Sequence, residues 1–178
     1  MYSQSDALIL LERYDPIDEN ELIAKRFIYD FVRQNVNYWS RSTLNGHLTA
    51  SAWITNQQQN QAVLLHHKKL DIWVQPGGHI DSSDESLQAA SLREAQEETG
   101  LKQLKITSTD IFDLDIHLIP ARKLEPEHWH LDVRFLFVAE QPHLEVSQES
   151  NAVVWFGRSE IEKLTEEESV LRMVRKTL

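Results

Sequence analysis

The sequence predicts an α/β (α+β) fold built around a mixed β-sheet, because helical and strand patterns alternate along the chain. The chain has 178 residues, of which 41% are hydrophobic and 26% are charged. These values are typical of one globular domain, so we expect a single domain over residues 1–178. Cysteine is absent, which excludes a disulfide, a thiolate zinc site and a cysteine nucleophile.

An N-terminal helical extension is predicted over about residues 1–45. Over residues 18–35, apolar side chains recur every three or four positions, which is the pattern of an amphipathic helix. A second helix is predicted over about residues 83–99, where Gly100 ends it.

Strands are indicated by alternating or continuous apolar runs outside these helices. The Asn and Gln cluster at residues 56–61 is typical of a turn between two strands. Ser159 followed by Glu162 is typical of a capping box, which predicts a C-terminal helix and a further helical stretch to the end. We predict strands over residues 47–55, 62–66, 72–74, 105–117, 130–139 and 152–156.

The charge pattern limits the partners that the protein can bind. Its 18 basic and 28 acidic side chains give a net charge of −10. Because no basic block is present, a nucleic-acid interface is not expected, and an anionic ligand would need a cation to attract it. The apolar run at residues 7–11 is too short for a signal peptide or a membrane span, so we expect a cytoplasmic protein.

Three glutamates lie close together on the predicted helix that ends at Gly100. Glu94, Glu97 and Glu98 are related by spacings of three and four, which places their side chains on one helix face. One arginine, Arg93, cannot neutralise all of these carboxylates. Hard divalent cations such as Mg²⁺ take oxygen ligands and keep positions for water and phosphate. The pattern therefore predicts half of a metal site whose other half is an anionic substrate.

An acidic helix face can also be an ordinary solvated surface, so the flanking residues decide between the two interpretations. Gly77 and Gly78 before the helix let the backbone approach a ligand. Gly100 ends the helix directly after Glu97 and Glu98, where the helix dipole disfavours negative charge. A feature that destabilises a helix end indicates a compensating cation, and the metal site is the favoured interpretation.

The segment from Gly78 to Leu101 resembles the Nudix box of the Nudix hydrolases. That motif reads Gly, five residues, Glu, seven residues, Arg-Glu, an apolar residue, any residue, Glu-Glu, any residue, Gly and an apolar residue. From Glu85 through Arg93 to Leu101 the chain matches throughout. The difference lies at the front, where six residues separate Gly78 from Glu85. This extra residue shifts either the carbonyl of Gly78 or the start of the helix.

The resemblance implies a Nudix-like α/β/α sandwich and a metal-dependent hydrolase. Its substrate would be a small nucleoside diphosphate linked to another moiety, cleaved at the pyrophosphate bond, with Mg²⁺ or Mn²⁺ as the cofactor. A homodimer is a further expectation from the family. Glu94 or Glu98 would be the general base, and Arg93 would orient a neighbouring glutamate. The residues implied to hold or border the metal are Glu94, Glu97, Glu98 and Gly78.

Three further glutamates have two interpretations each. In some family members the base comes from a loop outside the box, and Glu145 and Glu149 lie in such a predicted loop. For each residue alone, a solvated acidic loop is the favoured interpretation. Glu85 is the first glutamate of the motif, but Ser82 three residues earlier could form a capping box with it, which would make it a helix cap.

A polar row at the predicted strand over residues 130–139 offers a substrate-binding surface. Alternation places His128, His130, Asp132 and Arg134 on one face. An arginine can bind a phosphate through two hydrogen bonds. The same row could instead donate a histidine or an aspartate to a metal, or be a half-exposed sheet face. His79, directly after the glycines, is a further candidate for phosphate contact.

Two other functions are compatible with the same fold. A protein of the isopentenyl diphosphate isomerase type relies on a catalytic cysteine, which this chain lacks. A non-catalytic protein that binds or senses a nucleotide metabolite would not need the full set of acids. Since Arg93, Glu94, Glu97 and Glu98 are all present, the sequence favours catalysis.

Overall fold

A computed structural model describes residues 3–43, 45–121, 126–148 and 150–178 of the chain. The helices are α1 (Gln4–Arg13), α2 (Glu19–Gln34), α3 (Leu87–Thr99), α4 (Arg158–Leu164) and α5 (Glu168–Thr177). The strands are β1 (Gly46–Asn56), β2 (Gln61–His67), β3 (Ile72–Val74), β4 (Gly77–His79), β5 (Leu104–Ile106), β6 (Asp113–Ile119), β7 (His128–Ala139) and β8 (Ser150–Gly157). None of the described helices is both long enough and apolar enough to span a membrane.

The described strands form one eight-stranded mixed sheet, which confirms the predicted class. β1 and β7 run parallel over a long register that sets Gly46 opposite Trp129. The other pairings are antiparallel. β1 also pairs with the short strand β4, so that Ala50 lies opposite Gly78. This pairing brings the Gly77-Gly78 segment next to the centre of the sheet.

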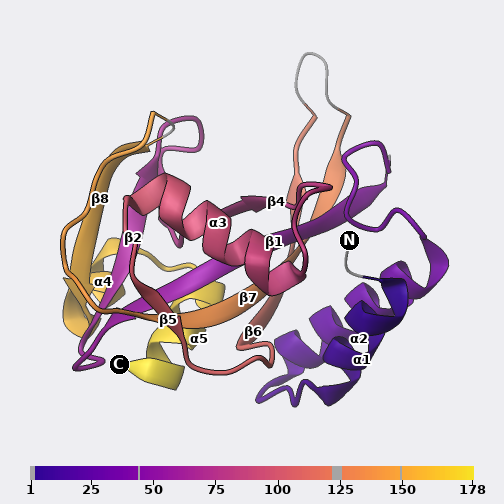
Figure 1. The fold of residues 1–178 in the computed structure, drawn as a ribbon, viewed down its shortest axis with the longest axis horizontal. Helices are drawn as coiled ribbons and strands as arrows, with labels where there is room; N and C mark the ends of the chain where they lie inside the picture. Colours follow the sequence, from indigo (N-terminus) through magenta and orange to yellow (C-terminus); the bar gives the residue numbers. More distant parts are fainter. Residues whose placement is uncertain (1–2, 44, 122–125, 149) are drawn as a thin grey trace.

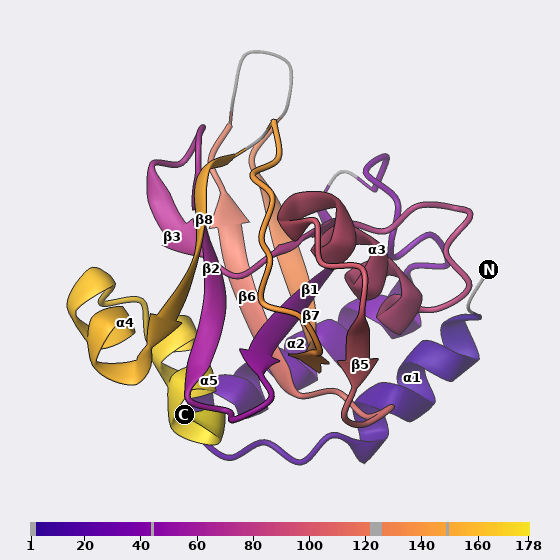
Figure 2. The same ribbon diagram turned by 60° about the vertical axis from the view of Figure 1, so that its left-hand side comes forward.

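Helices cover both faces of the sheet, as Figures 1 and 2 show. On one face, Ala52 and Ile54 of β1 lie in an apolar cluster with Ala95 of α3, to which α1 and α2 also contribute. On the other face, Trp53 of β1 belongs to a second cluster with Met173 of α5. Because successive strand residues point to opposite faces, β1 contributes side chains to both apolar clusters. This is the arrangement of the expected α/β/α sandwich.

Residues 3–43 contain two helices, whereas the periodicity indicates one. α2 coincides with the predicted helix, and the side chain of its N-cap Asp18 accepts a hydrogen bond of 2.8 Å from the backbone N–H of Glu21. The short apolar run at residues 7–11 lies in α1, where Leu11 is fully buried. That run is too short for helical periodicity to be recognised in the sequence.

The strand predicted over residues 105–117 is interrupted in the structure, where β5 and β6 pair with different parts of β7. Between them, the backbone N–H of Asp110 donates to the hydroxyl of Ser108 at 3.0 Å. Such local side-chain hydrogen bonds compete with strand pairing. The predicted capping box of Ser159 and Glu162 is also wrong, because the side chain that accepts from the N-cap N–H, at 2.7 Å, is that of Glu160.

The acidic helix α3 begins later than predicted, with Ser86 as its N-cap. The hydroxyl of Ser86 accepts a hydrogen bond of 3.0 Å from the backbone N–H three residues along. The capping box proposed for Ser82 and Glu85 is therefore wrong, because both residues lie in the loop before the helix. At the other end, Gly100 adopts a left-handed φ of 71° and ends the helix as predicted.

Removal of the Ser86 hydroxyl is expected to destabilise the protein measurably. Ser86→Ala leaves a backbone donor of the first turn without its cap, which typically costs about 1 kcal/mol of unfolding free energy. Ser82→Ala is the matched control, with an expected change below about 0.5 kcal/mol. Urea denaturation followed by circular dichroism measures both values. Equal values for the two variants would contradict the assigned helix start.

A buried network of ion pairs joins the sheet to the C-terminal helix. Arg134 of β7 binds Asp113 at 3.1 Å and Asp132 at 2.7 Å. From α5, Arg172 and Lys176 each reach Asp113 at 2.9 Å, and α2 joins the network through its buried glutamate. Removing one member of such a network leaves uncompensated buried charge. The stability of this region is therefore expected to depend on each of these charged side chains.

Stability is expected to fall in acid as Asp113 loses its charge. Burial alone would raise the pKa of Asp113, but the hydrogen bond from Arg172 and the charges of Arg134, Arg172 and Lys176 together lower it from 3.8 to about 2. Since the folded pKa lies below the unfolded one, this carboxylate stabilises the fold fully above about pH 4. The stabilisation, about 2 kcal/mol, is lost as the pH falls toward the folded pKa.

Urea unfolding at a series of pH values between neutrality and pH ~2.5 measures this loss. Asp113→Asn is expected to be less stable at neutral pH and to show a flatter dependence on pH than the unchanged protein. A pH dependence that is the same in both proteins would contradict the assignment to Asp113.

Candidate active site

The acidic end of α3 faces the backbone of β4. The N–H of Gly77 donates a hydrogen bond of 2.8 Å to Oε2 of Glu98. One residue along, Gly78 leaves space for the carboxylate of Glu94, because a Cβ at Gly78 would stand 2.6 Å from Oε2 of Glu94. The two glycines therefore lie directly against two of the three predicted metal ligands.

Arg93 links the acidic helix to the loop and the strand before it. Its guanidinium binds Asp84 through two hydrogen bonds of 3.0 and 2.9 Å. It also donates to Oε1 of Glu94 at 2.8 Å and to the carbonyl of His79 at 2.9 Å. Glu97 lies 3.5 Å away. These contacts fix the orientation of Glu94 toward the glycine pair.

Asp84 is a residue of this cluster that the sequence interpretation missed. The motif can be aligned from either end. Counted backward from Arg93, its first acid is Glu85, but counted forward from Gly78, with five residues between, its first acid is Asp84. The structure pairs Asp84 with Arg93 and leaves Glu85 exposed in the loop. The count forward from Gly78 could therefore have identified Asp84 from the sequence. On that count, the extra residue of the motif lies between Asp84 and α3.

The carboxylates exceed the positive charge available to them. Burial raises the pKa of Glu94 above its usual value, although the adjacent Arg93 opposes this shift. Glu98 is only 9% exposed, while the side chain of Glu97 is 61% exposed. All three offer oxygen donors, which Mg²⁺ and Mn²⁺ prefer. In the chemistry of their donor atoms these residues fit a hard divalent cation, and their role as metal ligands stays a prediction.

Gly78→Ala is expected to impair the site more than the fold. The new methyl group would displace the carboxylate of Glu94, which is the flexible end of its side chain. If the protein is a hydrolase, we expect its activity to fall by about tenfold or more, with a change in unfolding temperature of only a few degrees. Gly157→Ala is the matched control, because its Cβ would come no closer than 3.4 Å to another atom. Equal activity of the two variants would contradict the close approach at Gly78.

An open groove of about 420 Å³ adjoins the end of α3. Glu97 and Gly100 of the helix end line it together with Glu145 of the segment before β8. The backbone N–H of Glu145 donates to the carbonyl of Thr99 at 2.8 Å, which anchors this segment to the helix. The structure thus brings Glu145 beside the acidic cluster, where its role as a base stays a prediction. Glu149 lies outside the described residues.

The polar row of β7 divides into a buried part and a half-buried part. Asp132 and Arg134 are 1% and 2% exposed. Asp132 accepts hydrogen bonds from the hydroxyls of Thr49 and Ser51 at 3.0 and 2.7 Å, so it ties β7 to β1. Direct contact of Asp132 and Arg134 with a substrate stays a prediction, and their burial favours a structural role.

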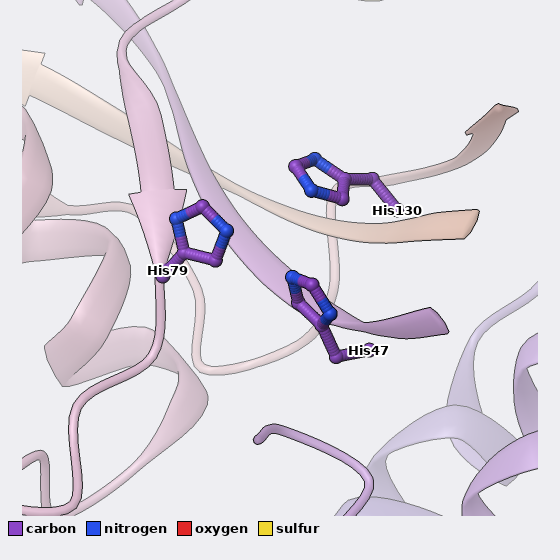
Figure 3. A group of neighbouring side chains, drawn as sticks. All are labelled: His47, His79 and His130. Carbon is purple, nitrogen blue, oxygen red and sulfur yellow. The ribbon is translucent and has the colours of Figure 1, made fainter. Parts of the chain in front are cut away.

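Five histidines gather where β1, β4, β6 and β7 adjoin. The rings of His79 and His130, both predicted as substrate contacts, lie 5.2 Å apart between centroids. His47 of β1 lies 5.0 and 4.9 Å from them, and Figure 3 shows the three rings turned toward one another. His117 and His128 each contact His130. The sequence did not indicate His47, because only the parallel register of β1 and β7 sets it opposite His130.

The two predicted histidines are neutral at physiological pH. Burial, with the positive charge of Arg41 and neighbouring histidines, lowers the pKa of His79 to about 3. Burial and four neighbouring histidines lower the pKa of His130 to about 2. A neutral imidazole has one nitrogen that donates and one with a lone pair, so each ring can bind either an acceptor or a metal ion.

Solved structures with similar architecture support the fold. A structure of a C. elegans Ap4A hydrolase binary complex gives a TM-score of 0.58 at 21% identity, covering 72% of this chain and 93% of that one. A NUDIX family hydrolase from Clostridium perfringens gives 0.57 at 24% identity, covering 75% and 96%. The NUDIX domain of Shewanella oneidensis NrtR, in complex with ADP ribose, gives 0.54 at 19% identity, covering 79% and 93%.

Curated relatives match part of the chain. The asymmetrical bis(5'-nucleosyl)-tetraphosphatase of Mus musculus is 30% identical over 97 residues, which are 54% of this chain and 59% of that protein. The Rattus norvegicus protein of the same name is 29% identical over 107 residues, which are 60% and 66%. The chain thus covers less than two thirds of the length of either relative. The model of the NUDIX domain matches residues 46–176, from the start of β1 into α5. Because this match spans most of the chain and includes the box that lies against β4, the chain belongs to the NUDIX domain family.

Proposed function

We propose that the protein is a metal-dependent pyrophosphohydrolase that acts on a nucleoside diphosphate linked to another moiety. The observation that carries this proposal is the placement of Glu94 and Glu98 against the backbone of Gly77 and Gly78, with Arg93 holding Glu94. A protein that only bound a nucleotide would have no need to keep several carboxylates together with one arginine. The arrangement instead favours catalysis.

The reaction requires a base beside the scissile bond. Water attacks phosphorus, its proton passes to a carboxylate oxygen, and the bond between phosphorus and the bridging oxygen breaks, leaving two phosphate-terminated products. Glu94 and Glu98 are the candidates for this base within the box.

Glu94, Glu97 and Glu98 would hold the cation. When bound, Mg²⁺ or Mn²⁺ neutralises phosphate charge and lowers the pKa of water. Because the chain carries a net charge of −10, it would otherwise repel an anionic substrate. Lys102 lines the groove beside the helix end, where its ammonium group can contact a phosphate.

Dinucleoside polyphosphates are the first substrates to test, because both curated relatives are named for cleaving that class. The test panel adds nucleotide sugars, ADP-ribose and nucleoside triphosphates, each with Mg²⁺ or Mn²⁺, and chromatography identifies the products. We expect at least one compound to be cleaved between phosphates, with activity lost on chelation and restored by the metal. Binding without turnover across the panel would contradict the proposal and favour the non-catalytic alternative.

A further inference from the structure

We propose that His47, His79 and His130 form a second metal site, which binds a transition-metal cation of the Zn²⁺ class through imidazole nitrogens. The three histidines come from β1, β4 and β7, and Figure 3 shows their rings turned toward one shared space. This site contains no member of the acidic cluster of α3. It does not depend on the function proposed above.

The positions of the nitrogen atoms carry the proposal. One ring nitrogen from each of the three histidines lies within 4.8 Å of the others. Two nitrogens bound to one tetrahedral Zn²⁺ stand about 3.3 Å apart, so small rotations of the rings are enough to complete the site. Nε2 of His128 already lies 3.2 Å from Nε2 of His130. His128 is therefore the candidate for a fourth ligand.

The chemistry of the donors selects the class of metal. Imidazole nitrogens bind Zn²⁺, Cu²⁺ and Ni²⁺, whereas Mg²⁺ prefers oxygen ligands. His47 is 3% exposed, and His79 and His130 are half-buried, so an ion could enter from the side of the latter two.

Arg41 lies beside this site and contacts one of its rings. Its Nη2 lies 2.7 Å from Nδ1 of His79. Because a guanidinium only donates hydrogen bonds, Nδ1 of His79 carries the lone pair. Arg41 is exposed, so it can move away at little cost. The arginine and a metal ion therefore compete for the same ring.

Titration of the chelator-stripped protein with Co²⁺ in excess Mg²⁺ tests the proposal, because the Mg²⁺ occupies oxygen sites. We expect one equivalent of Co²⁺ with the visible absorption of a nitrogen-ligated ion, displaced by one equivalent of Zn²⁺. His130→Gln and His79→Gln are each expected to weaken Zn²⁺ binding on the order of 100-fold. Using two separate variants keeps the test decisive if one of them fails to fold, which circular dichroism detects.

Three further variants serve as controls. His143→Gln removes an exposed histidine outside the cluster and is expected to bind Zn²⁺ as the unchanged protein does. Glu98→Gln alters the acidic cluster and is also expected to keep the Zn²⁺ site. Arg41→Gln is expected to bind Zn²⁺ several times more tightly, and an equal or weaker affinity would contradict the competition with the guanidinium.

Each of three results would overturn the histidine site. The first is the absence of Co²⁺ or Zn²⁺ binding to the unchanged protein in excess Mg²⁺. The second is a Zn²⁺ affinity that survives in both histidine variants. The third is a Zn²⁺ affinity that is lost in Glu98→Gln, which would place the ion among the carboxylates. None of these measurements uses hydrolysis as its readout, so their failure is distinguishable from a failure of the proposed pyrophosphohydrolase activity.

Discussion

Glu98→Gln is expected to lower turnover of the best substrate by on the order of 100-fold or more while the protein stays folded. The substitution removes the negative charge that would bind a cation or take a proton. Glutamine keeps an oxygen that can accept the 2.8 Å hydrogen bond from the N–H of Gly77, so the packing of α3 on β4 is preserved. The measurement is kcat with saturating Mg²⁺ or Mn²⁺, together with the unfolding temperature.

Glu140→Gln is the matched control for this substitution, because it changes an exposed glutamate just past the end of β7. We expect its turnover to equal that of the unchanged protein. Unchanged turnover in Glu98→Gln, with folding intact, would remove the catalytic role assigned to the acidic cluster.

Arg134→Ala is expected to lower the free energy of unfolding by at least about 3 kcal/mol. The guanidinium is 2% exposed and binds Asp113, Asp115 and Asp132. Its removal takes away the cation paired with the buried Asp132 and one of the three cations paired with Asp113. Arg175→Ala is the control, since Arg175 pairs with Glu168 on the surface and such pairs contribute about 0–1 kcal/mol.

Urea denaturation separates the two functions that Arg134 can have. A large loss of stability supports the structural role that its burial favours. Normal stability with a raised KM would instead show that Arg134 binds substrate, as the polar row of β7 indicates in the sequence alone.

The acidic cluster is predictable from sequence because its geometry is local. Spacings of three and four place Glu94, Glu97 and Glu98 on one side of any α-helix. Gly100 ends that helix through its own left-handed conformation. The start of α3 is less predictable, because Ser82, Ser83 and Ser86 all offer a capping hydroxyl and only the folded loop selects Ser86.

The remaining site residues depend on contacts between distant segments. His47 joins His130 only through the parallel pairing of β1 with β7, which no local pattern encodes. Arg134 looks like a phosphate ligand on an isolated strand, but β6 and α5 supply its partners from other parts of the chain. Polar residues on strands are therefore the hardest to interpret before the pairing of the strands is known.

Anomalous diffraction from crystals soaked in Mn²⁺ tests whether the acidic end of α3 binds a divalent cation. We predict a manganese peak bounded by the carboxylates of Glu94 and Glu98, beside the backbone of Gly78, and the loss of that peak in Glu98→Gln. A map without a peak at that position, at Mn²⁺ concentrations that support hydrolysis, would contradict the proposed metal-dependent mechanism.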